Sequence, residues 1–219
     1  FESNFNQIGN SGDAEGNMIS ANEQFGLLLN NCDDNLVYNN IVGLDITGSS
    51  GFFGSGNGFV GIYLGNGSDN NEIGGAASDE GNVICSNGGA GLTIEASLGN
   101  FVYHNRIGIN KDGTVLYPNI QEGILLVNGA DDNNIGGASD GMTNSIAGHS
   151  NNVSVYNSSL NDIVNNNIGN NTDGTDTLDG AFMQSRGIVL ASGSAENNIL
   201  DNVISGMVNG TGIRIEGFG

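Results

Sequence analysis

The basic side chains of this sequence are few, and two of them lie close together. The chain has 219 residues, with 4 Lys and Arg against 24 Asp and Glu. Arg106 occupies the outward position of a short predicted strand, and Lys111 and Asp112 follow in the next loop. A basic group beside a carboxylate is the start of an acid–base site, but catalysis also requires further oriented partners. Because the sequence indicates no third partner, we assign no catalytic residue and expect Arg106 and Lys111 to neutralise part of the negative charge.

Adjacent carboxylates occur twice, at Asp33–Asp34 and at Asp131–Asp132. A glycoside hydrolase needs two carboxylates that converge on one bond. Neighbouring residues of a strand point to opposite sides, so neither pair is expected to converge. Both pairs directly follow a predicted strand, where Asp is a common turn residue, and we interpret them as turns. His104 and His149 occupy unrelated positions and lack the spacing of a zinc site.

Oxygen-bearing side chains recur in the predicted loops in a way that suits calcium. The motif Asn-x-Asp-Gly-Thr occurs at 110–114 and again at 171–175. Carboxylate and amide oxygens are the ligands that Ca²⁺ prefers, although neither loop has the twelve-residue pattern of an EF-hand. The alternative is that these residues only form solvated turns. Calcium is the one cofactor that we consider, and its candidate ligands are Asp45, Asn110, Asp112, Asn171 and Asp173.

A repeated pattern of three short steps must position all these residues. The first and second steps read Asn-x-aliphatic, the third reads Gly-aliphatic-x-aliphatic, and a fixed internal repeat of this kind is typical of solenoid proteins. First steps begin at Asn6, Asn35, Asn71, Asn100, Asn133, Asn161 and Asn197. Second steps begin at Asn17, Asn40, Asn82, Asn105, Asn144, Asn166 and Asn202. Third steps begin at Gly26, Gly61, Gly91, Gly123, Asn152, Gly187 and Gly212, where Asn152 is the one departure from Gly.

Each step predicts a strand of three or four residues, because Asn and Gly at its boundaries tolerate the left-handed turns that end it. Three strands make one triangular coil, and like strands of successive coils stack in parallel around one apolar core. The inward column of the first strands is Ile8, Val37, Ile73, Val102, Ile135, Ile163 and Ile199. The second column is Ile19, Val42, Ile84, Ile107, Ile146, Ile168 and Ile204. The third column is Leu29, Leu64, Ile94, Leu126, Val155, Leu190 and Ile215.

The predicted fold class is therefore all-β, a right-handed parallel β-helix of about seven three-strand coils. Residues 1–219 form a single domain, either complete or a segment of a longer solenoid. Because the chain does not begin with Met, we interpret it as a processed chain or a fragment. The Asn residues at the bends are expected to hydrogen bond to the Asn of the next coil and to nearby peptide groups, as a ladder.

The insertions between strands alternate from coil to coil. Odd coils carry a loop between their first and second strands, at 9–16, 74–81 and 136–143. Even coils carry a longer loop between their second and third strands, at 43–60, 108–122 and 169–186. We expect each class of loop to emerge at one corner of the helix, so that the stack has two decorated edges.

Two loop motifs carry a resemblance to known proteins. Asn-x-Ile-Gly-Gly occurs at 71–75 and 133–137, and Asn-x-Ile-Gly-x-Asn-x-x-Gly occurs at 105–113 and 166–174, with a degenerate copy at 40–48. The chain thereby resembles right-handed parallel β-helix proteins of pectate-lyase-like architecture, and more closely the repeat regions of large secreted or surface proteins of bacteria. The resemblance covers nearly the whole chain and implies the fold and an extracellular or cell-surface location. It implies no single activity, because such repeats accompany many functions.

The net charge of −20 narrows the classes of partner. Nucleic acid and anionic membranes are repelled by such a surface, so we predict no nucleic-acid binding. The sequence has no run of 18 apolar residues, and we predict no membrane insertion. Neutral glycans stay compatible with this charge. Cys32 and Cys85 are placed two coils apart, which is too far for a disulfide, and we expect free thiols.

Apolar residues at outward positions predict a lateral contact stripe. Exposed apolar stripes on a soluble protein often mark contact surfaces. The alternative is that the chain's own long loops, which are rich in Phe and Leu, cover these residues. The stripe consists of Met18, Leu28, Ile41, Tyr63, Val83, Leu125 and Val189.

The two ends of the predicted stack have open strand edges and no predicted cap. If a second copy of the sequence is written directly after Gly219, its Asn6 falls 28 residues after Asn197. This distance matches the spacing between the first-step Asn residues of other coils. We therefore predict that the ends stack on copies of the chain or on flanking solenoid coils. The end-stacking residues are Asn6, Gln7, Ile8, Gly212, Ile213, Arg214 and Ile215.

The predicted function is that of an extracellular structural or adhesive β-helix that stacks head to tail by parallel strand addition. It is either a segment of a surface adhesin or a filament subunit, and we do not expect catalysis. The alternatives are a carbohydrate-active β-helix, which is a polysaccharide lyase or a glycoside hydrolase, and a non-catalytic glycan-binding module.

Overall fold

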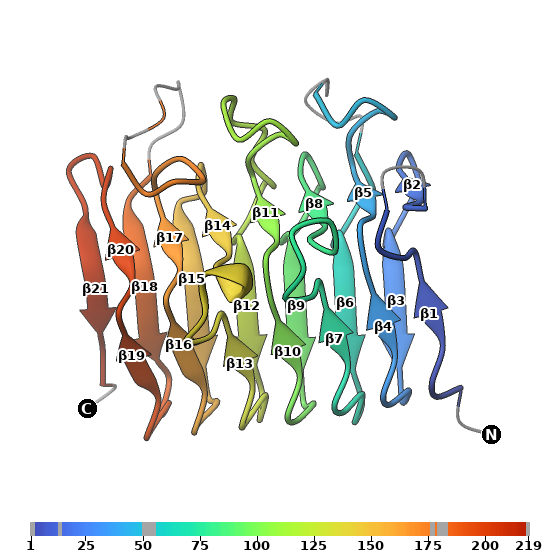
Figure 1. The fold of residues 1–219 in the computed structure, drawn as a ribbon. Helices are drawn as coiled ribbons and strands as arrows, with labels where there is room; N and C mark the ends of the chain where they lie inside the picture. The colour runs from blue at the N-terminus through green and yellow to red at the C-terminus, as the bar shows by residue number, and fades with distance from the viewer. Residues whose placement is uncertain (1–2, 13–14, 50–55, 176–177, 179–183, 218–219) are drawn as a thin grey trace.

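The structure, a computed structural model, describes residues 3–12, 15–49, 56–175, 178 and 184–217. Within these residues it contains 21 β-strands and one 3₁₀-helix, η1 (Asp140–Met142). The strands form three parallel sheets of seven strands each, which run side by side along the stack (Figure 1). The prediction of an all-β parallel β-helix with seven three-strand coils is confirmed.

Each sheet collects one strand from every coil. Sheet A consists of β1 (Gln7–Ile8), β4 (Leu36–Val37), β7 (Glu72–Ile73), β10 (Phe101–Val102), β13 (Asn134–Ile135), β16 (Asp162–Val164) and β19 (Asn198–Leu200). Sheet B consists of β2 (Met18–Ile19), β5 (Ile41–Val42), β8 (Val83–Ile84), β11 (Arg106–Ile107), β14 (Ser145–Ile146), β17 (Asn167–Ile168) and β20 (Val203–Ile204). Sheet C consists of β3 (Leu27–Asn30), β6 (Ile62–Gly65), β9 (Leu92–Glu95), β12 (Ile124–Val127), β15 (Asn151–Tyr156), β18 (Arg186–Ala191) and β21 (Thr211–Ile215).

The three predicted aliphatic columns are in register throughout the stack. In sheet A, for example, Val37 pairs with Ile73, which pairs with Val102. In the middle coils these side chains are fully buried. A fully buried aliphatic side chain contributes roughly 1.5–3 kcal/mol, so the columns hold together strands that are too short to be stable on their own.

Left-handed turns separate the strands, as the Asn and Gly boundaries predict. The residue before every first-step Asn has a positive φ, including Asp34 (56°) and Asp132 (57°). Their neighbours Asp33 and Asp131 accept backbone N–H bonds of 2.9 and 2.6 Å from Asp69 and Ser159 in other coils. The interpretation of both Asp pairs as turn residues is therefore confirmed.

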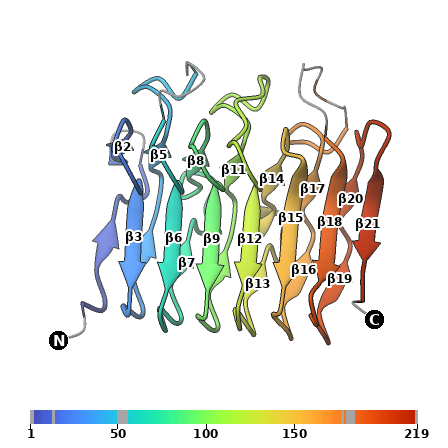
Figure 2. The same ribbon diagram turned by 180° about the vertical axis from the view of Figure 1, so that it is seen from behind.

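The two classes of insertion emerge on opposite sides of sheet B. The loops that precede β8 and β14 leave the corner between sheets A and B, and η1 lies in the second of them. The described parts of the loops that follow β5, β11 and β17 rise at the corner between sheets B and C, at the top of Figure 1. Sheet B therefore lies between two rows of loops, whereas the outer face of sheet C is crossed by none in the view of Figure 2.

The two cysteines are free, as predicted, and burial raises the pKa of the Cys85 thiol to about 12. In the described part of the chain, no helix has the length and apolar character required to span a membrane.

Candidate functional site

Asparagine ladders join every coil to the next at two corners of the stack. In the ladder that begins at Asn6, the backbone N–H and the Nδ2 of Asn35 both donate to Oδ1 of Asn71, each at 2.9 Å. The ladder that begins at Asn17 repeats this arrangement, for instance from Asn82 to Asn105 at 3.1 and 2.9 Å. The inner members are buried and fully used in hydrogen bonding, so the predicted structural role of these Asn residues is confirmed.

A third ladder, which was not predicted, runs along the corner between sheets B and C. It joins Asn22, Asn57, Asn87 and Asn119 through Nδ2–Oδ1 bonds of 2.7–2.8 Å. The signal was present, because each of these Asn residues lies four positions before a third-step Gly. In the fifth coil the ladder residue is His149, whose Nε2 accepts from the backbone N–H and the Nδ2 of Asn119, both at 3.2 Å.

The presence of His149 in place of Asn in this ladder explains why the third step of the fifth coil begins with Asn152 and not with Gly. The other ring nitrogen, Nδ1, lies 3.2 Å from Oδ1 of Asn152, and Nδ2 of Asn152 donates to Oε1 of Gln184 at 3.1 Å. Because Nε2 accepts two bonds, the network assigns the proton of the neutral imidazole to Nδ1. Asn152 thus links His149 in the fifth coil to Gln184 in the sixth. A Gly at position 152 would have no side chain to make this link.

The buried His149 should make the stability of the fold depend on pH. Burial lowers the pKa of His149 to about 4, against an unfolded value near 6.5. Above pH 6.5 both states are neutral, so His149 adds no pH dependence. Between pH 6.5 and 4 the unfolded state alone takes up the proton, and the free energy of unfolding should fall by about 3 kcal/mol from this group. Urea unfolding of the wild type and of His149→Asn, measured across this range, checks the prediction.

The His149→Asn variant has the ladder residue of the other coils and no group that titrates there, so the wild type should lose about 3 kcal/mol relative to it as the pH falls from 6.5 to about 4. Carboxylate titration contributes to both proteins and cancels in the difference. His104→Asn is the matched control, because the His104 ring is only partly buried and lies outside the ladders. Parallel pH profiles of the wild type and His149→Asn would contradict the prediction.

The two ends of the stack expose residues that are buried in every inner coil. At the carboxyl-terminal end Ile213 is 44% and Ile215 is 74% exposed, whereas their partners Ile188 and Leu190 in the preceding coil are 0% and 8% exposed. Of the other predicted end-stacking residues, Asn6 and Gln7 are exposed, and Ile8 and Gly212 are half-buried. Arg214 forms an ion pair with Glu216, the one ion pair among the described residues.

The ladders also give the ends a polarity. In every rung the backbone N–H or Nδ2 donates toward the coil that follows in sequence. The amino-terminal coil therefore presents Oδ1 acceptors outward, at Asn6 and Asn17. The carboxyl-terminal coil presents the backbone N–H donors of Asn197 and Asn202 outward.

A polar trough runs along the outer face of sheet B, between the two rows of loops. Three hollows of about 190, 270 and 300 Å³ make up the trough. They are neighbours along the sheet, because Arg106 lines the first and second, and Lys111 and Ile41 line the second and third. The outward residues of five successive strands form the floor: Met18, Ile41, Val83, Arg106 and Ser145.

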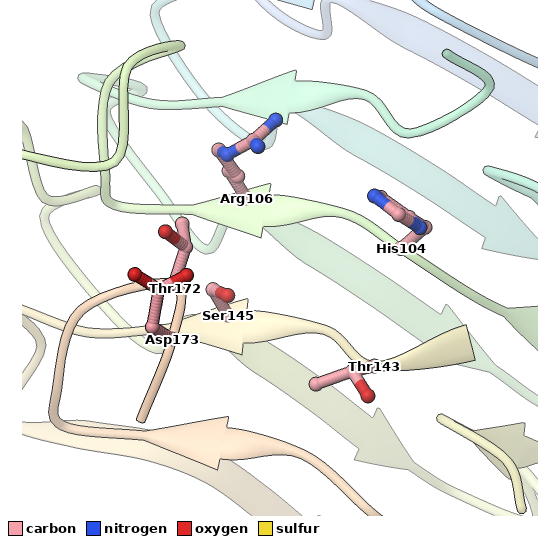
Figure 3. Close-up of a pocket in the computed structure, with 6 residues that line it drawn as sticks. All are labelled: His104, Arg106, Thr143, Ser145, Thr172 and Asp173. Carbon is pink, nitrogen blue, oxygen red and sulfur yellow. The ribbon is translucent and has the colours of Figure 1, made fainter. Parts of the chain in front are cut away.

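Both rows of loops contribute walls to this trough. In Figure 3, His104 and Thr143 lie at the amino-terminal side of β11 and β14, and Thr172 and Asp173 lie at the carboxyl-terminal side. In the second hollow, Asp79 comes from the loop before β8, and Lys111 and Asp112 come from the loop after β11. Sequence reasoning found Arg106, Lys111 and Asp112 as neighbours and found Asp112 and Asp173 in the same loop motif, but it missed that Asp79, His104 and Thr143 line the same face.

Arg106 is the central charged group of the trough. It is half-buried, and its Nε has no hydrogen-bond partner among the described residues. Burial lowers its pKa, and the charges of Asp112 and Asp173 oppose this effect. Neither carboxylate lies within ion-pair distance in the described structure, so the guanidinium faces the trough with donor capacity to spare.

The polar groups of the trough are suited to binding a ligand and not to acid–base catalysis. Asp79, Asp112 and Asp173 are all exposed to solvent. A general acid in glycoside hydrolysis requires a carboxyl group that its surroundings keep protonated. The arrangement can therefore bind hydroxyl and carbonyl groups, and we assign it no reaction.

The candidate calcium ligands lie in three separate loops, after β5, β11 and β17. Oδ1 of Asn110 accepts the backbone N–H groups of Thr114 and Val115, at 2.8 and 3.0 Å, and Oδ1 of Asn171 accepts that of Thr175 at 3.0 Å. Oδ1 of Asp45 accepts both N–H and O–H of Thr47. No three His, Cys, Asp or Glu side chains gather around a metal-sized space in the described part of the chain. These contacts favour the turn interpretation, and calcium binding stays a prediction.

The residues of the predicted lateral stripe lie on two different faces. Met18, Ile41 and Val83 belong to the floor of the trough, and Leu44 and Tyr117 of the long loops pack with Ile41 and Val83. The other four residues face outward from sheet C, where Leu28 is 48% and Val189 is 3% exposed. Tyr63 packs against Phe25, with ring centroids 5.2 Å apart. The structure thus divides the stripe, and its loops cover part of it.

Comparison with protein-family models gives no match, and comparison with curated proteins gives no similar protein.

Proposed function

We propose that this protein is a structural β-solenoid whose ends stack head to tail on further copies of the same chain. The observation that carries the proposal is the combination of open apolar columns and polar ladders at the two ends. Strand addition satisfies the backbone groups of an open sheet edge and buries the apolar side chains beside it. The extracellular or cell-surface location that the sequence resemblance implies is part of the proposal.

The polarity of the ladders supports head-to-tail contact over contact between like ends. The Oδ1 acceptors of Asn6 and Asn17 meet the backbone N–H donors of Asn197 and Asn202 only when the amino-terminal coil of one copy follows the carboxyl-terminal coil of another. Two carboxyl-terminal ends would bring donors against donors, and leaving buried donors unpaired costs about 1–3 kcal/mol each. The parallel register of all three sheets also continues in this arrangement alone.

Charge opposes this assembly at low ionic strength. Each copy carries a net charge of −20, and copies repel one another over the Debye length, which is about 10 Å at 0.1 M salt. We therefore expect association to strengthen as salt is added. Sedimentation velocity at low salt and at about 0.5 M NaCl should show species that lengthen with protein concentration, and electron microscopy should show end-to-end particles.

The variant Ile213→Glu/Ile215→Glu tests the contact surface. Both side chains are exposed in one copy, so the isolated fold should change little, but two carboxylates at the interface should abolish stacking. Val115→Glu is the matched control, because Val115 is 46% exposed in a loop of the fourth coil, away from both ends. A wild type that stays monomeric at every salt and protein concentration would refute the proposal, as would assembly of the double variant.

A further inference from the structure

The trough on sheet B has a shape that suits an extended ligand. Its floor crosses five coils, and coils are spaced by about 4.8 Å, so the floor is roughly 20 Å long. Each hollow alone is small, but the shared residues Arg106, Lys111 and Ile41 place the three side by side in one row. A compact ligand would need an enclosed pocket that covers most of its surface. The trough instead offers a long and open path along the stack.

The polar lining of the trough balances donors and acceptors. Arg106 and Lys111, two of the four Lys and Arg residues of the chain, line it together with Asp79, Asp112 and Asp173. The trough is therefore close to neutral on a protein whose net charge is −20. Amide and hydroxyl groups of Asn39, Thr143 and Thr172 complete the walls.

The floor divides into an apolar part and a polar part. Met18, Ile41 and Val83 form the part in the first three coils, where Met18 is 48% exposed, Ile41 is half-buried and Val83 is only 4% exposed. Arg106 and Ser145 form the next part, where Nε of Arg106 is buried without a partner among the described residues. This atom has almost no exposed surface, so a ligand oxygen would meet the other N–H groups of the half-buried guanidinium.

Three classes of extended ligand can be distinguished by these features. Nucleic acids and other polyanions are repelled by the net charge, and their phosphates would meet three carboxylates in the trough. An extended peptide binds best by adding a strand to an open sheet edge, but the floor is the face of a sheet whose inner strands are paired on both sides. A neutral sugar chain needs paired donors and acceptors at its hydroxyl groups and apolar surface at its ring faces, and the trough supplies both.

We propose that the trough on sheet B binds a linear neutral polysaccharide along the axis of the stack, with Arg106 as its central hydrogen-bond donor. The exposed parts of Met18 and Ile41 contact the faces of the sugar rings. The walls on both sides contact the hydroxyl groups at the ring edges. This binding uses the lateral face and is independent of stacking at the ends.

Calorimetric titration with three neutral hexasaccharides, β-1,4-linked glucose, β-1,4-linked mannose and α-1,4-linked glucose, tests the proposal. At least one should bind, its affinity should exceed that of the matching disaccharide by about tenfold or more, and salt should leave it unchanged. Oligogalacturonate serves as the anionic probe and should not bind. Failure of all three hexasaccharides to bind at millimolar concentration would overturn the proposal, as would binding of the anionic probe alone.

The variant Arg106→Gln locates the ligand. Hydrogen bonds from a charged donor are strong, so the loss of Arg106 should weaken hexasaccharide binding by about tenfold or more. Arg214→Gln is the matched control, because Arg214 lies in the last coil outside the trough, and it should bind as the wild type does. Lys111→Gln, on an exposed loop side chain, is a second trough variant that leaves the core intact and should also weaken binding. Equal affinity in the wild type, Arg106→Gln and Lys111→Gln would place the ligand elsewhere and contradict the proposal.

Discussion

Replacing Asn105 by Asp should lower the free energy of unfolding by about 4 kcal/mol at neutral pH, although the two side chains have the same shape. Asn105 is completely buried, and its Nδ2 donates to the carbonyl oxygen of Ile73 at 2.7 Å and to Oδ1 of Asn144 at 3.1 Å. A carboxylate would place a second acceptor against both of these oxygens. It would also bury a charge that no cation compensates. Urea unfolding at pH 7 measures the loss.

The control for this variant is Asn134→Asp, which makes the same chemical change at an outward, half-buried position of β13. Water can solvate that carboxylate, and the repulsion from Asp162, its register partner in β16, adds a small cost, so the total effect should stay within about 1 kcal/mol. Burial raises the folded-state pKa of a carboxyl group, so the penalty of Asn105→Asp should be complete above that pKa and should decrease as the pH falls through it. A penalty that is equal in the two variants, or that does not decrease with acid, would show that the ladder contributes little.

The replacement of Gly108 by Ala should cost about 4 kcal/mol, an effect far above that of an ordinary Gly-to-Ala change. Gly108 begins the loop after β11 with φ of +79°, and a Cβ there would lie 2.1 Å from the carbonyl oxygen of Ala147 in the next coil. That oxygen belongs to the backbone and cannot move without separating the coils. The glycines that begin the other insertions have the same close approach, with Cβ–oxygen distances of 1.9–2.1 Å at Gly9, Gly43, Gly74, Gly136 and Gly169.

Gly129→Ala separates the two causes of this penalty. Gly129 has a similar φ of +85°, but nothing lies within 4 Å of its would-be Cβ. It should therefore show only the backbone cost of a left-handed Ala, about 1 kcal/mol. Thermal and urea unfolding of both variants measure the difference. If Gly108→Ala and Gly129→Ala were equally destabilised, the close approach between coils would have no energetic consequence.

The repeat explains why the coil and its register were predictable. Every strand is bounded by its own Asn or Gly and carries its own inward aliphatic residue, such as Ile73 in β7 or Ile107 in β11. A strand that slipped by one residue would turn this side chain outward, so the sequence pattern permits one register. The residue types that repeat at the strand boundaries also predicted the turn role of Asp33 and Asp131 and the Asn ladders at two corners.

Other features depend on residues that only the stack brings together. The third ladder changes from Asn to His149 and Gln184, and the spacing to the third step shortens from four residues to three. The departure at Asn152, which the sequence presents as an isolated exception, has its cause in this change. The predicted lateral stripe combined residues of sheets B and C because sequence position alone does not show which face a loop covers.

The sequence by itself determined the strands, the aliphatic columns and the parallel stacking, because each of these rests on interactions that repeat within one coil and between equivalent positions of adjacent coils. Tertiary structure alone decided the trough and the polarity of the ends. The trough joins Asp79, Arg106 and Asp173 from three different coils, and its form depends on loop lengths and on the corner from which each loop leaves. The polarity depends on whether the Oδ1 of each Asn side chain points to the preceding or to the following coil. The sequence shows that the residue is Asn but not which way its amide group points. Only the hydrogen-bond network of the whole stack aligns the amides in one direction.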